Sequence, residues 1–211
     1  MKDLHSAPGT KGRVLHSAVA YDLLAWLLLR GRERAFRERL VQLARVGRAQ
    51  SVLDIGCGTG SLAIATKRCV GPAGTVDGID ASPGMIARAR RKAHKSRVDV
   101  TFTTGVAEAL PYTDGRFDVV LSTLMLHHLP RPARALCIRE AARVVKPGGR
   151  VLVVDFGSAQ GKGREILAHF HRHGHIEPRE IHELLGSAGL CIVESGEVGV
   201  QHLHFVMATA P

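Results

Sequence analysis

The sequence is poor in aromatic residues, in cysteine and in long apolar runs. It contains one Trp, two Tyr and six Phe among 211 residues, so it offers few platforms on which nucleic-acid bases could stack. Its cysteines, Cys57, Cys69, Cys137 and Cys191, are scattered without a C-x-x-C pair. This argues against a disulfide framework or a zinc site and is typical of a reducing compartment. The longest nearly apolar stretch, residues 23–29, is far too short to span a bilayer.

Acidic residues are also few relative to basic ones, with 19 Asp and Glu against 29 Lys and Arg and a formal net charge of +10. Residues 88–97, RARRKAHKSR, hold six basic residues and no acid. Such a distribution is typical either of a solvated surface or of one that attracts an anionic membrane or nucleic acid, and charge alone does not separate these. The first residues have no apolar core behind a basic flank, so we predict no signal peptide and a cytoplasmic location.

Short apolar segments alternate with helix-like patterns along the chain, and no repeat or linker divides it. The expected strands are residues 51–55, 74–80, 98–104, 117–122, 150–156, 190–195 and 202–208. The expected helices are residues 17–29, 32–46, 62–69, 83–95, 133–145 and 178–188. Strands that alternate with helices predict a doubly wound, mostly parallel α/β sheet. The short connection between the last two strands predicts an antiparallel hairpin.

A glycine-rich turn follows the first expected strand. In VLDIGCGTG, residues 52–60, glycine occupies positions 56, 58 and 60. Glycine between a strand and a helix lets a ligand approach the main chain closely, although a purely structural turn has the same composition. Ser61 stands where the dinucleotide pattern G-x-G-x-x-G has its last glycine.

An acid ends the second expected strand, at Asp80. A carboxylate at this place can accept hydrogen bonds from both hydroxyls of a nucleoside ribose. The alternative is a helix cap beside Ser82. Residues 104–122 then bring a third loop to the same edge of the sheet.

Four segments resemble, in order and in spacing, the successive motifs of class I S-adenosylmethionine-dependent methyltransferases. They are residues 52–60, 78–90, 105–129 and 140–156. The resemblance implies a seven-stranded Rossmann-like sheet whose C-terminal strand is antiparallel, and S-adenosylmethionine as the cofactor. It implies no metal.

The resemblance also assigns roles to residues. Asp54 and the glycines of the turn would lie under the cofactor, Asp80 would hold the ribose, and Met85 would pack against the adenine. Many relatives have Asp where Val106 stands, so backbone atoms or Glu108 would have to serve the adenine amino group. The complete expected cofactor-binding set is Tyr21, Asp54, Gly56, Cys57, Gly58, Gly60, Asp80, Ala81, Met85, Val106, Ala107, Glu108 and Ser122.

Two adjacent histidines, His127 and His128, follow the fourth expected strand. Methyl transfer from a sulfonium needs alignment and dry surroundings rather than a protein nucleophile, but some acceptors must also lose a proton. Either histidine is a candidate general base, and we prefer His128. The alternative is a structural role, because LHHL recurs in relatives with different substrates.

The segment before the first motif resembles that of ubiquinone/menaquinone C-methyltransferases and of phospholipid N-methyltransferases, in which it forms a lid with a Tyr contact. This implies a helical lid at residues 1–48, with Tyr21 on the cofactor, in front of a methyltransferase domain at residues 49–211. The expected acceptor is a small hydrophobic molecule, quinone-like or lipid, with peripheral membrane contact. The segment after the fifth strand is shorter than in quinone enzymes, which leaves the acceptor pocket undefined.

Several alternatives remain open at the level of sequence. A nucleic-acid methyltransferase would suit the charge, but the amino-directed class places Asn/Asp-Pro-Pro-Tyr/Phe after the fourth strand, where this chain has STLMLHHL. Methylation of arsenicals would want clustered thiols. An NAD(P)-dependent oxidoreductase is disfavoured by Ser61, and a non-catalytic cofactor-binding protein is not excluded. Alternating histidines at positions 169, 171, 173 and 175 suggest a polar surface or pocket lining more than a metal site.

Overall fold

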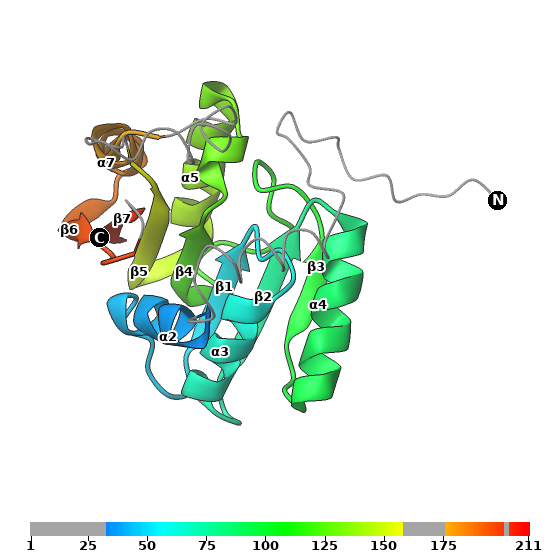
Figure 1. The fold of residues 1–211 in the computed structure, drawn as a ribbon. Coiled ribbons are helices and arrows are strands. Elements are labelled where there is room, and N and C mark those ends of the chain that lie inside the picture. Colours follow the sequence, from blue (N-terminus) through cyan, green and yellow to red (C-terminus); the bar gives the residue numbers. More distant parts are fainter. Residues whose placement is uncertain (1–32, 158–175, 201–202) are drawn as a thin grey trace.

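The computed structural model describes residues 33–157, 176–200 and 203–211 (Figure 1). The helices are α2 (Glu33–Leu43), α3 (Ser61–Val70), α4 (Pro83–Ser96), the short 3₁₀ helix η1 (Leu126–His128), α5 (Arg131–Val144) and α7 (Pro178–Ser187). The strands are β1 (Ser51–Ile55), β2 (Thr75–Asp80), β3 (Thr101–Thr104), β4 (Phe117–Thr123), β5 (Val145–Phe156), β6 (Cys191–Glu197) and β7 (Leu203–Thr209). Within these residues no helix is long and apolar enough to cross a membrane.

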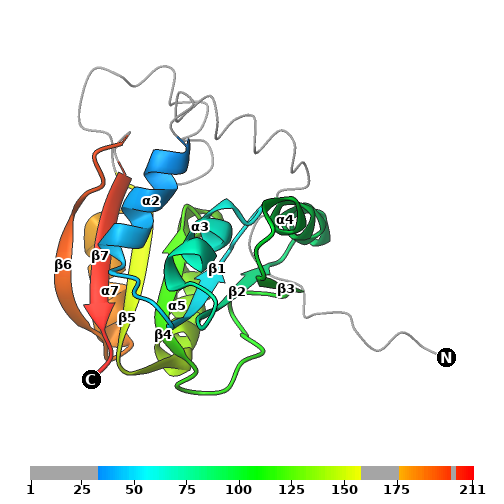
Figure 2. The ribbon, with the colours of Figure 1, turned by 90° about the horizontal axis from the view of Figure 1, so that it is seen from below.

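The strands form one seven-stranded sheet in the order β3-β2-β1-β4-β5-β7-β6. The pairs from β3 to β5 are parallel, whereas β7 runs antiparallel to both β5 and β6. Figure 2 shows β3 and β6 at opposite ends of the sheet. The order reverses between β1 and β4, and ligands of open α/β sheets bind outside the carboxyl ends of the strands at such a point.

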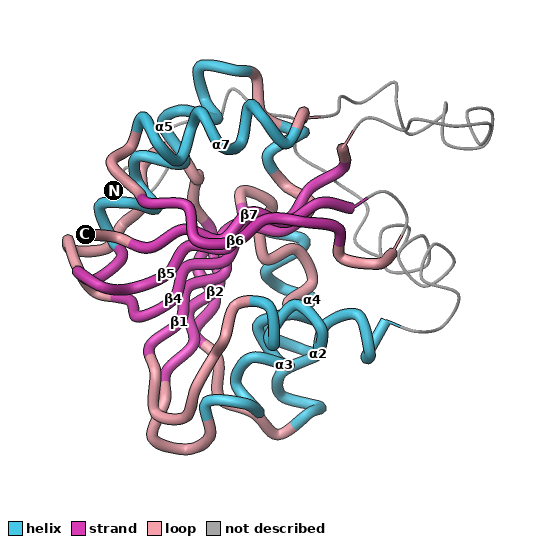
Figure 3. The backbone as a smooth tube through the Cα atoms, turned by 90° about the vertical axis from the view of Figure 1, so that its left-hand side faces the viewer, coloured by secondary structure: helices cyan, strands magenta, loops and turns pink. Residues whose placement is uncertain are grey.

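Helices cover both faces of the sheet, with α5 and α7 on one side and α2, α3 and α4 on the other (Figure 3). Successive residues of each central strand point to opposite faces, so the strands contribute to two separate cores. Val52 belongs to the core under α2, α3 and α4, and its neighbour Leu53 to the core under α5 and α7. Both side chains are fully buried.

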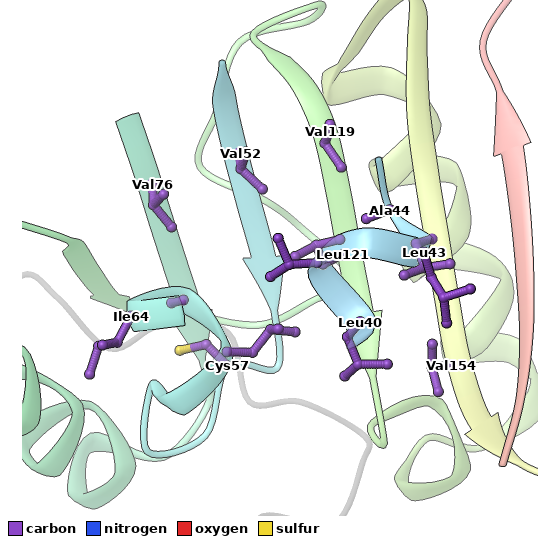
Figure 4. Close-up of a cluster of buried hydrophobic side chains, with 14 of the residues drawn as sticks. Leu40, Leu43, Ala44, Val52, Cys57, Ile64, Val76, Val119, Leu121 and Val154 are labelled. Carbon is purple, nitrogen blue, oxygen red and sulfur yellow. The ribbon is translucent and has the colours of Figure 1, made fainter. Parts of the chain in front are cut away.

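The helix that precedes β1 packs directly on the sheet. Figure 4 shows Leu40 and Leu43 of α2, with Ala44 just after it, beside Leu121 of β4 and Val154 of β5. All five side chains are buried. Residues from 33 onward are therefore part of the domain core, while residues 1–32, including Tyr21, lie outside the described part of the chain. The lid at residues 1–48 remains a prediction.

The predicted fold class is confirmed: the sheet has seven strands, is mostly parallel and ends in the expected antiparallel hairpin. Several boundaries differ by one to three residues, and the start of the fifth strand differs most. The fifth strand begins at Val145 and not at residue 150, because Val145 already pairs with Phe117 before an irregularity shifts the register to Val119 and Arg150.

Candidate cofactor-binding and active site

The glycine-rich turn and the acid at the end of β2 are joined directly. The Asp80 carboxylate accepts hydrogen bonds from the Gly58 N–H at 2.9 Å and from the Ser82 N–H at 2.8 Å, through different oxygens. The helix cap is Ser82 itself, whose hydroxyl oxygen accepts from the Met85 N–H. Burial raises the pKa of Asp80, and the two N–H donors partly offset this. Each oxygen keeps a lone pair that a ribose hydroxyl can use.

The glycines of the turn are required by backbone conformation and by packing. Gly56, Gly58 and Gly60 all have positive φ, at 69°, 53° and 77°, where side chains are strained. A Cβ on Gly56 would lie 2.3 Å from Met125, and one on Gly60 would lie 2.7 Å from the Phe102 ring. At these two positions, therefore, neighbouring protein side chains leave no room for a Cβ.

A buried ionic group lies under the turn. Asp54 at the end of β1 is 1% exposed, and neither of its carboxylate oxygens makes a hydrogen bond of normal geometry within the described residues. Desolvation raises its pKa to about 7, an effect that Asp80 increases and that Arg37 and a weak contact with the Ala63 N–H oppose. At neutral pH a considerable fraction of this carboxyl is thus protonated in the free protein.

Arg37 of α2 is the cation that faces this carboxyl, and the sequence analysis did not find it. It is 7% exposed, its Nε is buried without a hydrogen-bond partner in the described residues, and its closest carboxylate is Glu33 at 3.6 Å. A buried guanidinium with an unsatisfied N–H has unused capacity for an anionic ligand group.

Asp54 and Arg37 line a small cavity of about 10 Å³ together with Gly56, Cys57, Thr59, Ser61, Leu62 and Thr123. That volume takes the end of a ligand, such as an ammonium or carboxylate group, and not a nucleoside. A larger groove of about 570 Å³ shares Arg37 and Ser61 with it and continues between α2 and α3.

Lys92 ties the turn to α4, a contact the sequence analysis also missed. Its ammonium group donates to the Thr59 hydroxyl at 3.0 Å and to the Ser61 hydroxyl at 2.6 Å. The basic run at residues 88–97 therefore contains at least one structural cation that holds the turn in place.

The remaining predicted cofactor residues lie at the same edge of the sheet. Cys57, Met85 and Val106 are buried, and Ala81, Ala107 and Glu108 are partly exposed. Ser122, near the end of β4, has a buried hydroxyl without a hydrogen-bond partner in the described residues. Tyr21 and the histidines at 169–175 fall outside the described part of the chain. Among the residues that the structure describes, no group of three or more His, Cys, Asp or Glu side chains could hold a metal ion.

The two histidines after β4 differ in their contacts. His127 Nδ1 lies 2.6 Å from Asp155 Oδ1, and the His127 backbone N–H donates to Asp155 Oδ2 at 3.1 Å. The His128 ring lies 3.9 Å from the His127 ring, centroid to centroid. The structure thus places a carboxylate behind His127, although the sequence analysis preferred His128 as the base; Asp155 was not among the predicted residues.

Comparison with known proteins agrees with this geometry. Residues 52–149, just under half of the chain, match a family described as "Methyltransferase domain". The demethylmenaquinone methyltransferase of Halalkalibacterium halodurans is 38% identical over 136 residues, 64% of this chain and 55% of that protein. The ubiquinone/menaquinone biosynthesis C-methyltransferase of Yersinia pestis is 36% identical over 151 residues, 70% of this chain and 59% of that protein.

Among solved structures, a SAM-dependent methyltransferase from Aquifex aeolicus superposes with a TM-score of 0.72 at 22% identity. The match covers 93% of this chain and all of that one, and it supports the fold. The sheet order, the turn with its acid and the matched segment together define a class I S-adenosylmethionine-dependent methyltransferase domain, as the motifs predicted. The chain is similar to members of that family over residues 52–149, and it spans somewhat more than half the length of the curated relatives named above.

Proposed function

We propose that the chain transfers the methyl group of S-adenosylmethionine to a small hydrophobic acceptor of the quinone type. The observation that carries the proposal is Asp80, which bridges the Gly58 and Ser82 N–H groups and presents its remaining lone pairs at the edge of the sheet. The relatives named as quinone-biosynthesis methyltransferases support the acceptor class.

Arg37 and Asp54 would hold the amino-acid end of the cofactor. An α-amino acid carries a carboxylate and an ammonium group, and the small cavity is lined by one buried cation and one buried acid. Arg37 would bind the carboxylate and Asp54 the ammonium group. This would satisfy the Arg37 Nε and the Asp54 oxygens, which have no hydrogen-bond partner among the described residues. The nucleoside would lie outside this cavity, against Asp80.

The ribose assignment can be tested with two ligands and two proteins. We expect calorimetry to show that the wild type binds S-adenosylhomocysteine about 10- to 100-fold more tightly than its 2′,3′-dideoxy analogue, since a hydrogen bond to a charged group contributes about 1.5–3 kcal/mol. Asp80→Ala should bind both ligands weakly and equally. The exposed Asp99→Ala serves as the matched control and should keep the wild-type preference.

An Asp80→Ala protein that still prefers the ribose with hydroxyls would contradict the assignment. Binding of NAD in place of S-adenosylmethionine would contradict the cofactor. For the acceptor, methyl-labelled S-adenosylmethionine is incubated with the protein and cell extract, and label is followed into quinone, phospholipid, RNA and protein fractions. Label in RNA alone would replace this proposal by nucleic-acid methylation.

A further inference from the structure

Two residues to which the cofactor-binding motifs assign no cofactor contact, His127 and Asp155, meet near the glycine-rich turn. After β4 the chain forms η1, which contains His127, and Asp155 is the next-to-last residue of the adjacent strand β5. Parallel pairing of β4 with β5 brings both to the same edge of the sheet. Their side chains are 8% and 0% exposed, so the contact is shielded from water.

The Asp155 carboxylate accepts three hydrogen bonds, which fix its position. They come from His127 Nδ1 at 2.6 Å, from the His127 N–H at 3.1 Å and from the Phe156 N–H at 2.8 Å. A carboxylate bound to Nδ1 selects the tautomer with the proton on that nitrogen. Nε2 then carries the lone pair, and its direction is set because both the ring and its backbone are bound to the same acid.

The loop that carries this pair rests on the cofactor turn. Met125, two residues before His127, packs against Gly56 so closely that a Cβ on that glycine would lie 2.3 Å from it. The Phe156 ring packs edge-on against His127 with centroids 5.4 Å apart. The imidazole is therefore positioned by a carboxylate and an aromatic ring, on a segment that contacts the glycine-rich turn.

We propose that His127, oriented by Asp155, is the general base for the acceptor, which the pair identifies as a ring bearing a hydroxyl group. This inference rests on the proposed function and deepens it. His127 Nε2 takes the hydroxyl proton, and the ring carbon ortho to the resulting oxyanion attacks the sulfonium methyl group. The new C–C bond forms as the C–S bond breaks, and S-adenosylhomocysteine leaves. The ring C–H proton then passes to solvent and His127 returns its proton to the oxygen, so the hydroxylated ring is restored and one proton is released overall.

A base is useful for such an acceptor because a phenol carbon is a poor nucleophile until the hydroxyl ionises. A phospholipid amine attacks in its neutral form and releases its proton afterwards, so it does not need a positioned base in the same way. Of the two acceptor classes suggested by the sequence, quinone-like and phospholipid, the histidine–aspartate pair therefore favours the reduced, hydroxylated quinone.

The test measures single-turnover methyl transfer from labelled S-adenosylmethionine to a short-chain demethylmenaquinol, kept reduced with dithionite. We expect His127→Gln and Asp155→Asn to slow transfer by about 100-fold or more, the usual contribution of a general base. Both should bind S-adenosylmethionine within about twofold of the wild type by calorimetry, since neither is proposed to touch it. His94→Gln, an exposed histidine on α4, controls for the substitution and should leave the rate unchanged.

Chemical rescue separates a base from a structural contact. Added imidazole should restore part of the rate in His127→Ala, which a residue that only holds the loop would not allow. A His127→Gln rate within about fivefold of wild type, no rescue, or a loss of transfer confined to His128→Gln would each overturn the assignment. If the wild type binds S-adenosylmethionine but labels an amine headgroup and no quinol, the acceptor class and the base role both fall while the methyltransferase function stands.

Discussion

At the scale of single residues, the least expected feature is the protonation of Asp54. This carboxyl is fully buried and has a pKa of about 7 in the free protein, because desolvation raises the pKa more than the guanidinium of Arg37 lowers it. A ligand ammonium group bound beside it would favour the ionised form. The proposed cofactor contact is therefore also a proton-linked contact.

We predict that S-adenosylmethionine binds more tightly as pH rises from about 6 to about 8, because the free protein must lose the Asp54 proton to bind the ammonium group. Calorimetry at pH 7 in buffers of different ionisation enthalpy should show protons released on binding. Asp54→Asn should bind more weakly and without this release. A wild-type protein that binds without proton exchange would contradict the ammonium assignment.

The same pKa shift predicts how the stability of the free protein depends on pH. The folded pKa lies above the unfolded value of about 3.8, so between these values the folded state binds more protons than the unfolded state. The contribution of Asp54 is therefore present at pH 4 and is lost as the pH rises through about 7, by on the order of 4 kcal/mol. In urea unfolding of Asp54→Asn, the free energy of unfolding should not show this fall between pH 4 and pH 7. The same pH dependence in Asp54→Asn as in the wild type would contradict the assignment to Asp54.

At the scale of elements, the junction of β1 and α3 depends on tight packing at one glycine. Gly60 caps α3 in the left-handed conformation, and Phe102 of β3 and Ala89 of α4 occupy the space beside it. Gly148 in the irregular start of β5 has a similar φ of 72° but no atom within 4 Å of an added Cβ. Substitutions at Gly148 and Gly60 therefore separate two free-energy costs: that of a positive φ for a residue with a Cβ, and that of a steric clash of the Cβ with its neighbours.

We predict that Gly148→Ala lowers the free energy of unfolding by about 1–2 kcal/mol, the cost of positive φ for a residue with a Cβ. Gly60→Ala should lower it by about 1–3 kcal/mol more, because Phe102 and Ala89 would have to shift. Urea midpoints at unchanged m-value measure both. Equal losses for the two substitutions would show that the surroundings of Gly60 yield easily.

Most elements were predictable because their signals are local. Short apolar runs and turn residues placed every described strand, and Ser82-Pro83 placed the start of α4. The start of β5 was missed because Pro147-Gly148-Gly149 predicts a break, whereas Val145 ahead of it is already paired with β4.

At the scale of the whole molecule, the site residues that the sequence did not reveal are those whose partners lie far away in the sequence. Asp80 was predictable from its place at the end of β2. Lys92 meets Thr59 from 33 residues away, and Asp155 meets His127 from 28 residues away. No local pattern encodes such contacts; they arise when the parallel sheet brings distant strand ends to one edge. The basic run containing Lys92 was read only as surface charge.

The net charge of +10 gives a prediction about membranes. We expect the protein to co-sediment with phosphatidylglycerol-containing vesicles but not with neutral ones. Binding should fall when salt rises from about 0.1 M to about 1 M, which shortens the Debye length from about 10 to about 3 Å. Arg91→Glu on the exposed side of α4 should weaken binding more than Arg179→Glu on α7, although both change the charge equally. Equal effects would show that α4 is not the contact surface.

The packing of Met125 on Gly56 has a consequence for the order of events in a catalytic cycle. Because Met125 of the loop after β4 packs on the glycine-rich turn, we expect that ordering of the turn by the methyl donor also orders the loop that carries His127. By thermodynamic linkage the effect would be reciprocal: each substrate would raise the binding affinity of the other by the same factor. Such coupling would favour the complex that holds both substrates over either complex with one of them.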